Sequence, residues 1–150
     1  MTASHRRVSR IVVINERDEV LLFLTQSPKL VDPPTRWITP GGGVDAHETH
    51  LEGALRELFE ETGLVVDSLT GPVFTVDGTS RLASGAQQTS YAEFYVLRTA
   101  HFEVDKSNWL DYEHEDIKDV GWFTHAEIEG NNIPFAPPQL AEIVALALNS

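Results

Sequence analysis

PGGGVDAHETHLEGALRELFEETGL, residues 40–64, joins a glycine turn, a helix start, an acidic helix face and a helix stop in one unbroken segment. Thr49 followed three residues later by Glu52 has the spacing of a capping box, which starts a helix. Gly63 suits the position just beyond a helix end, where the backbone turns left-handed. The segment therefore predicts a helix over residues 49–62, entered through three consecutive glycines.

Three carboxylates share one narrow face of this helix, because side chains three and four residues apart lie side by side. They are Glu57, Glu60 and Glu61, and Gly53 on the same face leaves room for an ion. Like charges this close destabilise a helix by roughly 0.2–0.5 kcal/mol per pair unless something compensates. A hard divalent cation such as Mg²⁺ compensates, since it binds oxygen ligands. The alternative is a solvated acidic face with i,i+4 ion pairs through Arg56.

The spacing continues on both sides of the acidic face. Read from Gly42, the sequence gives Glu48 after five residues and the run RELFEETGL, residues 56–64, after seven more. This resembles the Nudix box of the Nudix hydrolase superfamily, G-x5-E-x7-R-E-U-x-E-E-x-G-U with U aliphatic, and every fixed position matches. The resemblance implies an α/β fold: an α/β/α sandwich with a mixed sheet between the box helix and the C-terminal helix. Residues 1–150 would form one such domain.

The resemblance also implies roles within the box. Glu60 and Glu61 are implied as direct metal ligands, Glu57 as a ligand or general base, and Gly41 as the donor of a backbone carbonyl to the metal. Arg56 is implied to orient the neighbouring carboxylates, since a guanidinium stays protonated and cannot act as a base.

Three further box residues are expected to support the structure, namely Gly42, Glu48 and Gly63. Glu48 either pairs with a cation of the box or, as an acid before the first turn, favours the helix dipole. In several branches of the family the general base comes from a loop before a late strand. That region contains Glu113 and Glu115, which we favour slightly over Asp116, and solvated surface groups are the alternative.

Substrate contacts are less readable from sequence. Arg81 and the N-terminal Arg6, Arg7 and Arg10 are candidates for phosphate. Family members often contact the base just before the last helix, which points to Asn131, Asn132, Phe135 and Gln139. Trp37, Trp109 and Phe135 are candidates for stacking on a base, with a buried core position as the alternative for each.

Charge and composition exclude several classes of function. A net charge of −12 argues against a nucleic-acid partner, whereas phosphate binding remains compatible if cations occupy the acidic site. The chain has no cysteine, which excludes disulfides, thiolate metal sites and a cysteine nucleophile. Its six histidines show no zinc spacing. We see no apolar leader and no stretch of membrane length, and we expect a soluble cytoplasmic protein without a membrane partner.

Apolar periodicity and turn residues predict the remaining elements. We expect strands at residues 8–14, 19–25, 37–39, 65–67, 73–76, 89–101 and 119–123, loops at 26–35 and 77–88, an acidic connection at 103–118 and a helix at 139–148.

Two functions remain open on this evidence. The first is a Nudix-type pyrophosphohydrolase that hydrolyses a phosphoanhydride bond in a nucleoside diphosphate derivative, nucleoside triphosphates included, by water attack at phosphorus. Its cofactor would be Mg²⁺, with Mn²⁺ as a substitute, and a homodimer is one expected assembly. The second is a nucleotide sensor that binds without turnover. The intact carboxylate set favours the enzyme, and the absence of cysteine disfavours an isomerase-like activity.

Overall fold

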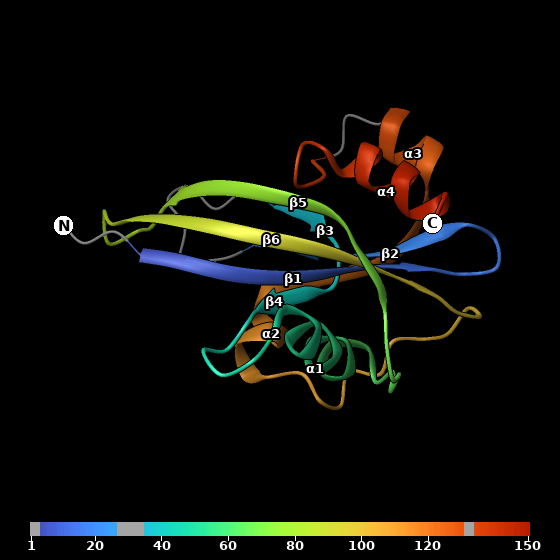
Figure 1. Cartoon of the computed structure of the whole chain (residues 1–150), viewed down its shortest axis with the longest axis horizontal. Helices are drawn as coiled ribbons and strands as arrows, with labels where there is room; N and C mark the ends of the chain where they lie inside the picture. Colours follow the sequence, from blue (N-terminus) through green and yellow to red (C-terminus); the bar gives the residue numbers. More distant parts are fainter. Residues whose placement is uncertain (1–3, 27–34, 131–133) are drawn as a thin grey trace.

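A mixed sheet lies between two helical layers in the computed structural model, which describes residues 4–26, 35–130 and 134–150. Helices α1 (His50–Thr62) and α2 (Asp111–Asp116) cover one face, and α3 (His125–Gly130) and α4 (Leu140–Leu148) cover the other (Figure 1). This arrangement confirms the predicted α/β/α sandwich. Within the described residues, none of the helices is both long enough and apolar enough to cross a membrane.

The sheet is built around β1 (Ser4–Ile14), which pairs in parallel with β6 (Gln87–Arg98) and antiparallel with β4 (Gly41–Gly43). β5 (Thr70–Arg81) pairs antiparallel with β6, and β2 (Glu19–Thr25) pairs antiparallel with β3 (Arg36–Ile38) and β7 (Ile117–Thr124). β1 and β2 pair at Ile14 and Val20, next to their connecting turn, and then take different partners. One parallel pair among antiparallel pairs makes the sheet mixed, as predicted.

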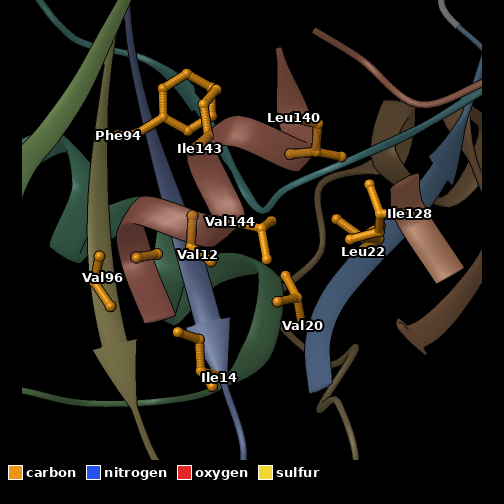
Figure 2. Packing of buried hydrophobic residues seen from close by; sticks show 11 residues of the cluster. Val12, Ile14, Val20, Leu22, Phe94, Val96, Ile128, Leu140, Ile143 and Val144 are labelled. Carbon is orange, nitrogen blue, oxygen red and sulfur yellow. The ribbon is translucent and has the colours of Figure 1, made fainter. Parts of the chain in front are cut away.

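Alternate residues of β1 face opposite layers, as the period of two in a strand requires. Val12 and Ile14 join the core under α4, which Figure 2 shows from close by, whereas Ile11 and Val13 join the core under α1. All four side chains are buried. A strand covered on both faces has no use for polar positions, which explains the unbroken apolar run of residues 11–14.

The box helix begins and ends as the sequence predicts. The Thr49 hydroxyl accepts a hydrogen bond from the Glu52 backbone N–H at 3.1 Å, and the Glu52 carboxylate accepts one from the Thr49 N–H at 2.9 Å. Gly63 follows with φ of 84° and ends the helix. Because these bonds are local, α1 starts at a fixed residue, and so the direction of each carboxylate along it is also fixed.

The hairpin of β5 and β6 replaces the loop expected at residues 77–88, and that prediction is wrong. Only residues 82–86 connect the two strands, and Arg81 pairs with Gln87. This half of the hairpin extends past both helical layers (Figure 1). Its strands have no core to bury there, so they lack the apolar alternation by which strands are recognised.

Other differences involve short elements. Residues 65–67 form no strand, and the expected acidic connection at 103–118 holds α2 and the first residues of β7. Helix α3 was not predicted. Most of the loop expected at 26–35, together with Asn131 and Asn132, lies outside the described residues.

Thr49→Ala is expected to reduce the free energy of unfolding by about 0.5–2 kcal/mol, the usual effect of removing a helix cap. Thr49→Ser is the matched control, since it keeps the capping hydroxyl and should stay close to wild type. Urea unfolding measures both. Equal stability of Thr49→Ala and wild type would show that the cap does not hold the helix start.

Candidate metal centre

Three buried carboxylates meet between α1 and α2. Glu57 and Glu61 come from α1 and Glu113 comes from α2, and each offers one oxygen within 4.8 Å of the others. Their exposed fractions are 7%, 5% and 6%, respectively. Buried carboxylates normally pair with cations, so a cluster of three is an unusual arrangement that calls for a positive partner.

Hydrogen bonds from the connection before α2 bring Glu113 to this place. The indole Nε1 of Trp109 donates to the backbone oxygen of Glu61 at 2.7 Å, and the Asp105 N–H donates to the Thr62 oxygen at 3.1 Å. A side chain at Gly63 would overlap Asp105, because an added Cβ would lie 2.8 Å from the Cβ of that residue. The glycine thus ends α1 and also admits the connection that carries Glu113.

The glycine strand β4 forms the other wall of the cluster. The Gly41 N–H donates to Glu61 Oε1 at 2.7 Å, and Gly41 has φ of 144°. A Cβ on Gly42 would lie 2.6 Å from Glu57 Oε1, so any side chain there would displace the carboxylate. Gly42 is therefore explained by the close approach of backbone to carboxylate, and Gly41 by the close approach of β1, since a Cβ on Gly41 would overlap the Ser9 backbone oxygen.

Arg56 connects the box by hydrogen bonds to four of the described residues. Its Nε and Nη2 bind the two oxygens of Glu48 at 2.8 and 2.9 Å, and Nη2 also donates to the Gly43 oxygen at 2.9 Å. Its Nη1 reaches Glu57 Oε1 at 3.1 Å and Glu60 Oε2 at 3.3 Å. Arg56 thus holds carboxylates of α1 and the loop after β4 in one arrangement.

The ionisation of these groups follows from their surroundings. Burial raises the pKa of Glu61 well above its usual range, and the nearby Glu57 carboxylate adds to this rise. Burial likewise raises the pKa of Glu57, although the Arg56 guanidinium opposes it. By contrast, the hydrogen bonds from Arg56 lower the pKa of Glu48 to about 2. The cluster is therefore short of positive charge, whereas Glu48 is fully compensated.

A hard divalent cation fits this donor set, because Mg²⁺ and Mn²⁺ prefer carboxylate oxygens. It would also counter the burial and the repulsion between carboxylates that together raise the pKa values of Glu57 and Glu61. Glu57, Glu61 and Glu113 are the described residues that the geometry brings together to hold it.

Other predicted residues lie around the cluster or away from it. Glu60 is next to the cluster, with its carboxylate on Arg56 and its side chain 26% exposed. Glu115 and Asp116 are outside the cluster, and Glu115 is exposed. Gly53 does not make room for an ion, because a Cβ there would lie 3.1 Å from Val44 Cγ2. Its missing side chain instead lets the loop after β4 pack against α1.

Several of the expected substrate residues lie away from the cluster. Arg81 ends β5 within the hairpin, and Gln139 is exposed just before α4. Phe135 and Trp37 both pack on Phe123, with ring centroids 5.6 and 4.8 Å apart, respectively. Trp109 is buried and supports Glu61, so it does not stack on a ligand. The roles of Arg81, Phe135 and Gln139 stay predictions.

Two residues at the start of α2 were missed by the sequence reading. Leu110 and Tyr112 are exposed and line a cavity beside Glu57 and Glu60. The only signal in the sequence was Glu113 itself, whose Oε1 accepts the Leu110 N–H at 2.9 Å and so begins a helix that was expected to be a connection.

Comparison with known proteins agrees with this fold and motif. The model of the NUDIX domain matches residues 4–146. An RNA pyrophosphohydrolase of Cereibacter sphaeroides is 26% identical over 154 aligned residues, covering 97% of this chain and 91% of the relative.

Solved structures show the same architecture. The dihydroneopterin triphosphate pyrophosphohydrolase of E. coli superposes with a TM-score of 0.70 at 15% identity, covering 98% of this chain and 99% of the other. The NUDIX domain of Shewanella oneidensis NrtR, crystallised with ADP ribose, gives 0.65 at 22% identity, covering 99% and 90%. The fold and box thus define a Nudix-type hydrolase. The chain belongs to the NUDIX family, whose enzymes generally use divalent metals.

Gly42→Ala is expected to weaken metal binding, because its Cβ would push the Glu57 carboxylate out of the cluster. For wild type, an ion at about 100 times its dissociation constant should raise the melting temperature by roughly 5–10 °C. Most of this rise should be lost in Gly42→Ala.

Gly130→Ala is the control for the substitution itself, since none of the described residues lies within 4 Å of an added Cβ there. Thermal melts with and without Mg²⁺ or Mn²⁺ measure all three proteins. A full metal-dependent rise in Gly42→Ala would contradict the site.

Glu48→Gln is expected to destabilise the protein at neutral pH and to make it less sensitive to acid. The folded pKa of Glu48, about 2, is below its ordinary value of 4.5. Ionised Glu48 therefore contributes stability that is complete above about pH 5 and is lost as the pH falls through about 2. Urea unfolding across this range measures the effect. A wild-type advantage that does not shrink on acidification would contradict it.

Proposed function

We propose that the protein hydrolyses a phosphoanhydride bond in a nucleoside diphosphate derivative, with nucleoside triphosphates among its substrates. The observation that carries this proposal is the cluster of Glu57, Glu61 and Glu113, all buried and short of positive charge. Mg²⁺ is the expected cofactor, with Mn²⁺ as a substitute. Glu60 and the Gly41 carbonyl are the further ligands that the family resemblance implies.

The chemistry requires such a cluster. A phosphoanhydride is protected by its negative charge, which repels an incoming nucleophile. A bound divalent ion supplies compensating charge on the phosphate oxygens and favours ionisation of water. The protein's own contribution is positional, because Arg56 and the Gly41 N–H fix the carboxylates before substrate arrives.

Proton transfer completes the reaction. As the oxygen of water bonds to phosphorus, the bridging P–O bond breaks and its electron pair leaves with the departing phosphate. The proton of the water goes to a carboxylate of the cluster. Glu113 is our proposed base, since it comes from outside the box helix and yet lies within the cluster. Glu115, the other residue favoured from sequence, is exposed.

The choice of substrate follows from charge and from the relatives. A net charge of −12 favours a small phosphorylated ligand over a long nucleic acid. A relative from C. sphaeroides is named an RNA pyrophosphohydrolase. RNA with a 5′-triphosphate is therefore the alternative substrate to compare. A sensor without turnover is less well supported, because binding alone does not require three carboxylates to be buried together.

A panel of nucleoside triphosphates, nucleoside diphosphate derivatives and short 5′-triphosphorylated RNA tests the proposal. We expect metal-dependent release of phosphate or pyrophosphate with at least one member. Glu113→Gln should lower the rate by roughly 100-fold or more, the range for loss of an acid–base group. Glu60→Gln and Glu61→Gln should also lower the rate, because each removes a carboxylate ligand of the cation. Glu115→Gln should remain near wild type.

Each competing assignment has its own result in this panel. Turnover without metal, or full activity in Glu61→Gln, would reject the proposed site. If Glu115→Gln loses activity and Glu113→Gln retains it, the role of general base would pass from Glu113 to Glu115. Absence of turnover together with nucleotide binding would favour the sensor.

A further inference from the structure

Three kinds of side chain line a cavity of about 650 Å³ beside the carboxylate cluster. Glu57 and Glu60 of α1 contribute acidic side chains to its wall, and Arg6 of β1 contributes a cation. Leu110 and Tyr112, at the start of α2, contribute apolar surface. We call this cavity the β1–α2 pocket. The pocket therefore has a charged part and an apolar part. A nucleotide has the same two parts, namely its charged phosphates and its flat base.

Arg6 is the cation of the pocket that is available to a ligand. Its neighbour Arg7 donates to the Asp45 oxygen at 2.8 Å, and Arg56 is bonded to Glu48. Among the described residues, the exposed guanidinium of Arg6 makes no hydrogen bond or ion pair. It lies along the glycine strand, where a Cβ on Gly43 would be 3.4 Å from its Nε. A planar guanidinium in this place matches the geometry of phosphate oxygens.

Tyr112 supplies the apolar part of the pocket. It is 56% exposed, and Leu110 beside it is 47% exposed. Two other aromatic candidates expose less of their rings, since Trp109 is buried and Trp37 is partly buried against Phe123. Tyr112 lines the same cavity as Glu57, so a group on its ring lies near the cluster. Flat exposed rings bind nucleobases by stacking, whatever the base.

We propose that the β1–α2 pocket positions a nucleoside 5′-polyphosphate by two separate contacts, with Arg6 on the phosphate chain and Tyr112 on the nucleobase. This inference rests on the proposed function and names the residues that select its substrate. It places the phosphates between a guanidinium on β1 and the carboxylate cluster on α1, with the base over α2.

Binding of two ligands that resist hydrolysis tests whether Arg6 binds the phosphates and Tyr112 binds the base. One is a methylene-bridged nucleoside triphosphate, and the other is methylenediphosphonate, which has no nucleoside. With Mg²⁺ present, calorimetric titration should show that Arg6→Gln weakens both ligands by about 10-fold. Tyr112→Ala should weaken the nucleotide by about 5-fold to 100-fold, the range for loss of one stacked base. It should leave the diphosphonate within about twofold, and Tyr112→Phe should keep the nucleotide affinity.

Arg17→Gln is the matched control for loss of one positive charge, because Arg17 is 63% exposed and pairs with Glu19 away from the pocket. It should bind both ligands as wild type does. Melting temperatures establish that each variant is folded, which is expected because the side chains of Arg6, Tyr112 and Arg17 are all exposed. Equal weakening by Arg17→Gln and Arg6→Gln, or equal loss of both ligands in Tyr112→Ala, would overturn the proposal. So would failure of wild type to bind either ligand.

Turnover by the wild-type protein separates this inference from the proposed function. If wild type hydrolyses a nucleotide but Arg6→Gln and Tyr112→Ala bind normally, only the pocket assignment fails. If the variants lose binding as expected but wild type has no turnover, the pocket stands and the hydrolase assignment fails. A nucleotide affinity that changes in Phe135→Ala but not in Tyr112→Ala would move the base to the α4 face of the sheet.

Discussion

The bidentate hydrogen bonding of the Arg56 guanidinium to the Glu48 carboxylate is the interaction on which the rest of the site depends. It joins the loop after the glycine strand to the middle of α1, and the same guanidinium reaches Glu57 and the Gly43 oxygen. Bidentate contacts of this kind fix direction as well as distance. With Arg56 fixed, its Nη1 holds the Glu57 carboxylate at 3.1 Å, while the Gly41 N–H holds Glu61 at 2.7 Å.

This arrangement costs stability in the absence of a ligand. Burial and mutual repulsion raise the pKa values of Glu57 and Glu61, which means that the surrounding protein disfavours their charged forms. The fold tolerates this because the apolar cores on both faces of β1 hold α1 and the sheet together independently. Perturbed carboxylates beside an open cavity are typical of sites that act on a ligand rather than of surface ion pairs.

Local signals made α1 predictable, whereas long-range contacts determined the rest of the site. The capping box and Gly63 lie within the helix segment, so sequence alone placed Glu57 and Glu61. The sequence could not choose Glu113 over Glu115, because that choice depends on Trp109 binding the end of α1. It also could not show that position 42 needs a glycine to leave room for the Glu57 carboxylate, since this contact joins β4 and α1. The prediction of a loop at residues 77–88 was wrong for a related reason. The strands there lie outside the core, so their sequence carries no apolar alternation.

The carboxylates come from parts of the chain that are made at different times. α1 holds Glu57 and Glu61, and both β5 and β6 must be synthesised before Glu113 appears in α2. A nascent chain that ends after β6 can form the capped helix, yet it lacks the third carboxylate and the indole that supports it. Domains emerge from the ribosome from the N-terminus onward. The complete carboxylate cluster therefore exists only after α2 has been synthesised, later than the helix that supplies two of its three members.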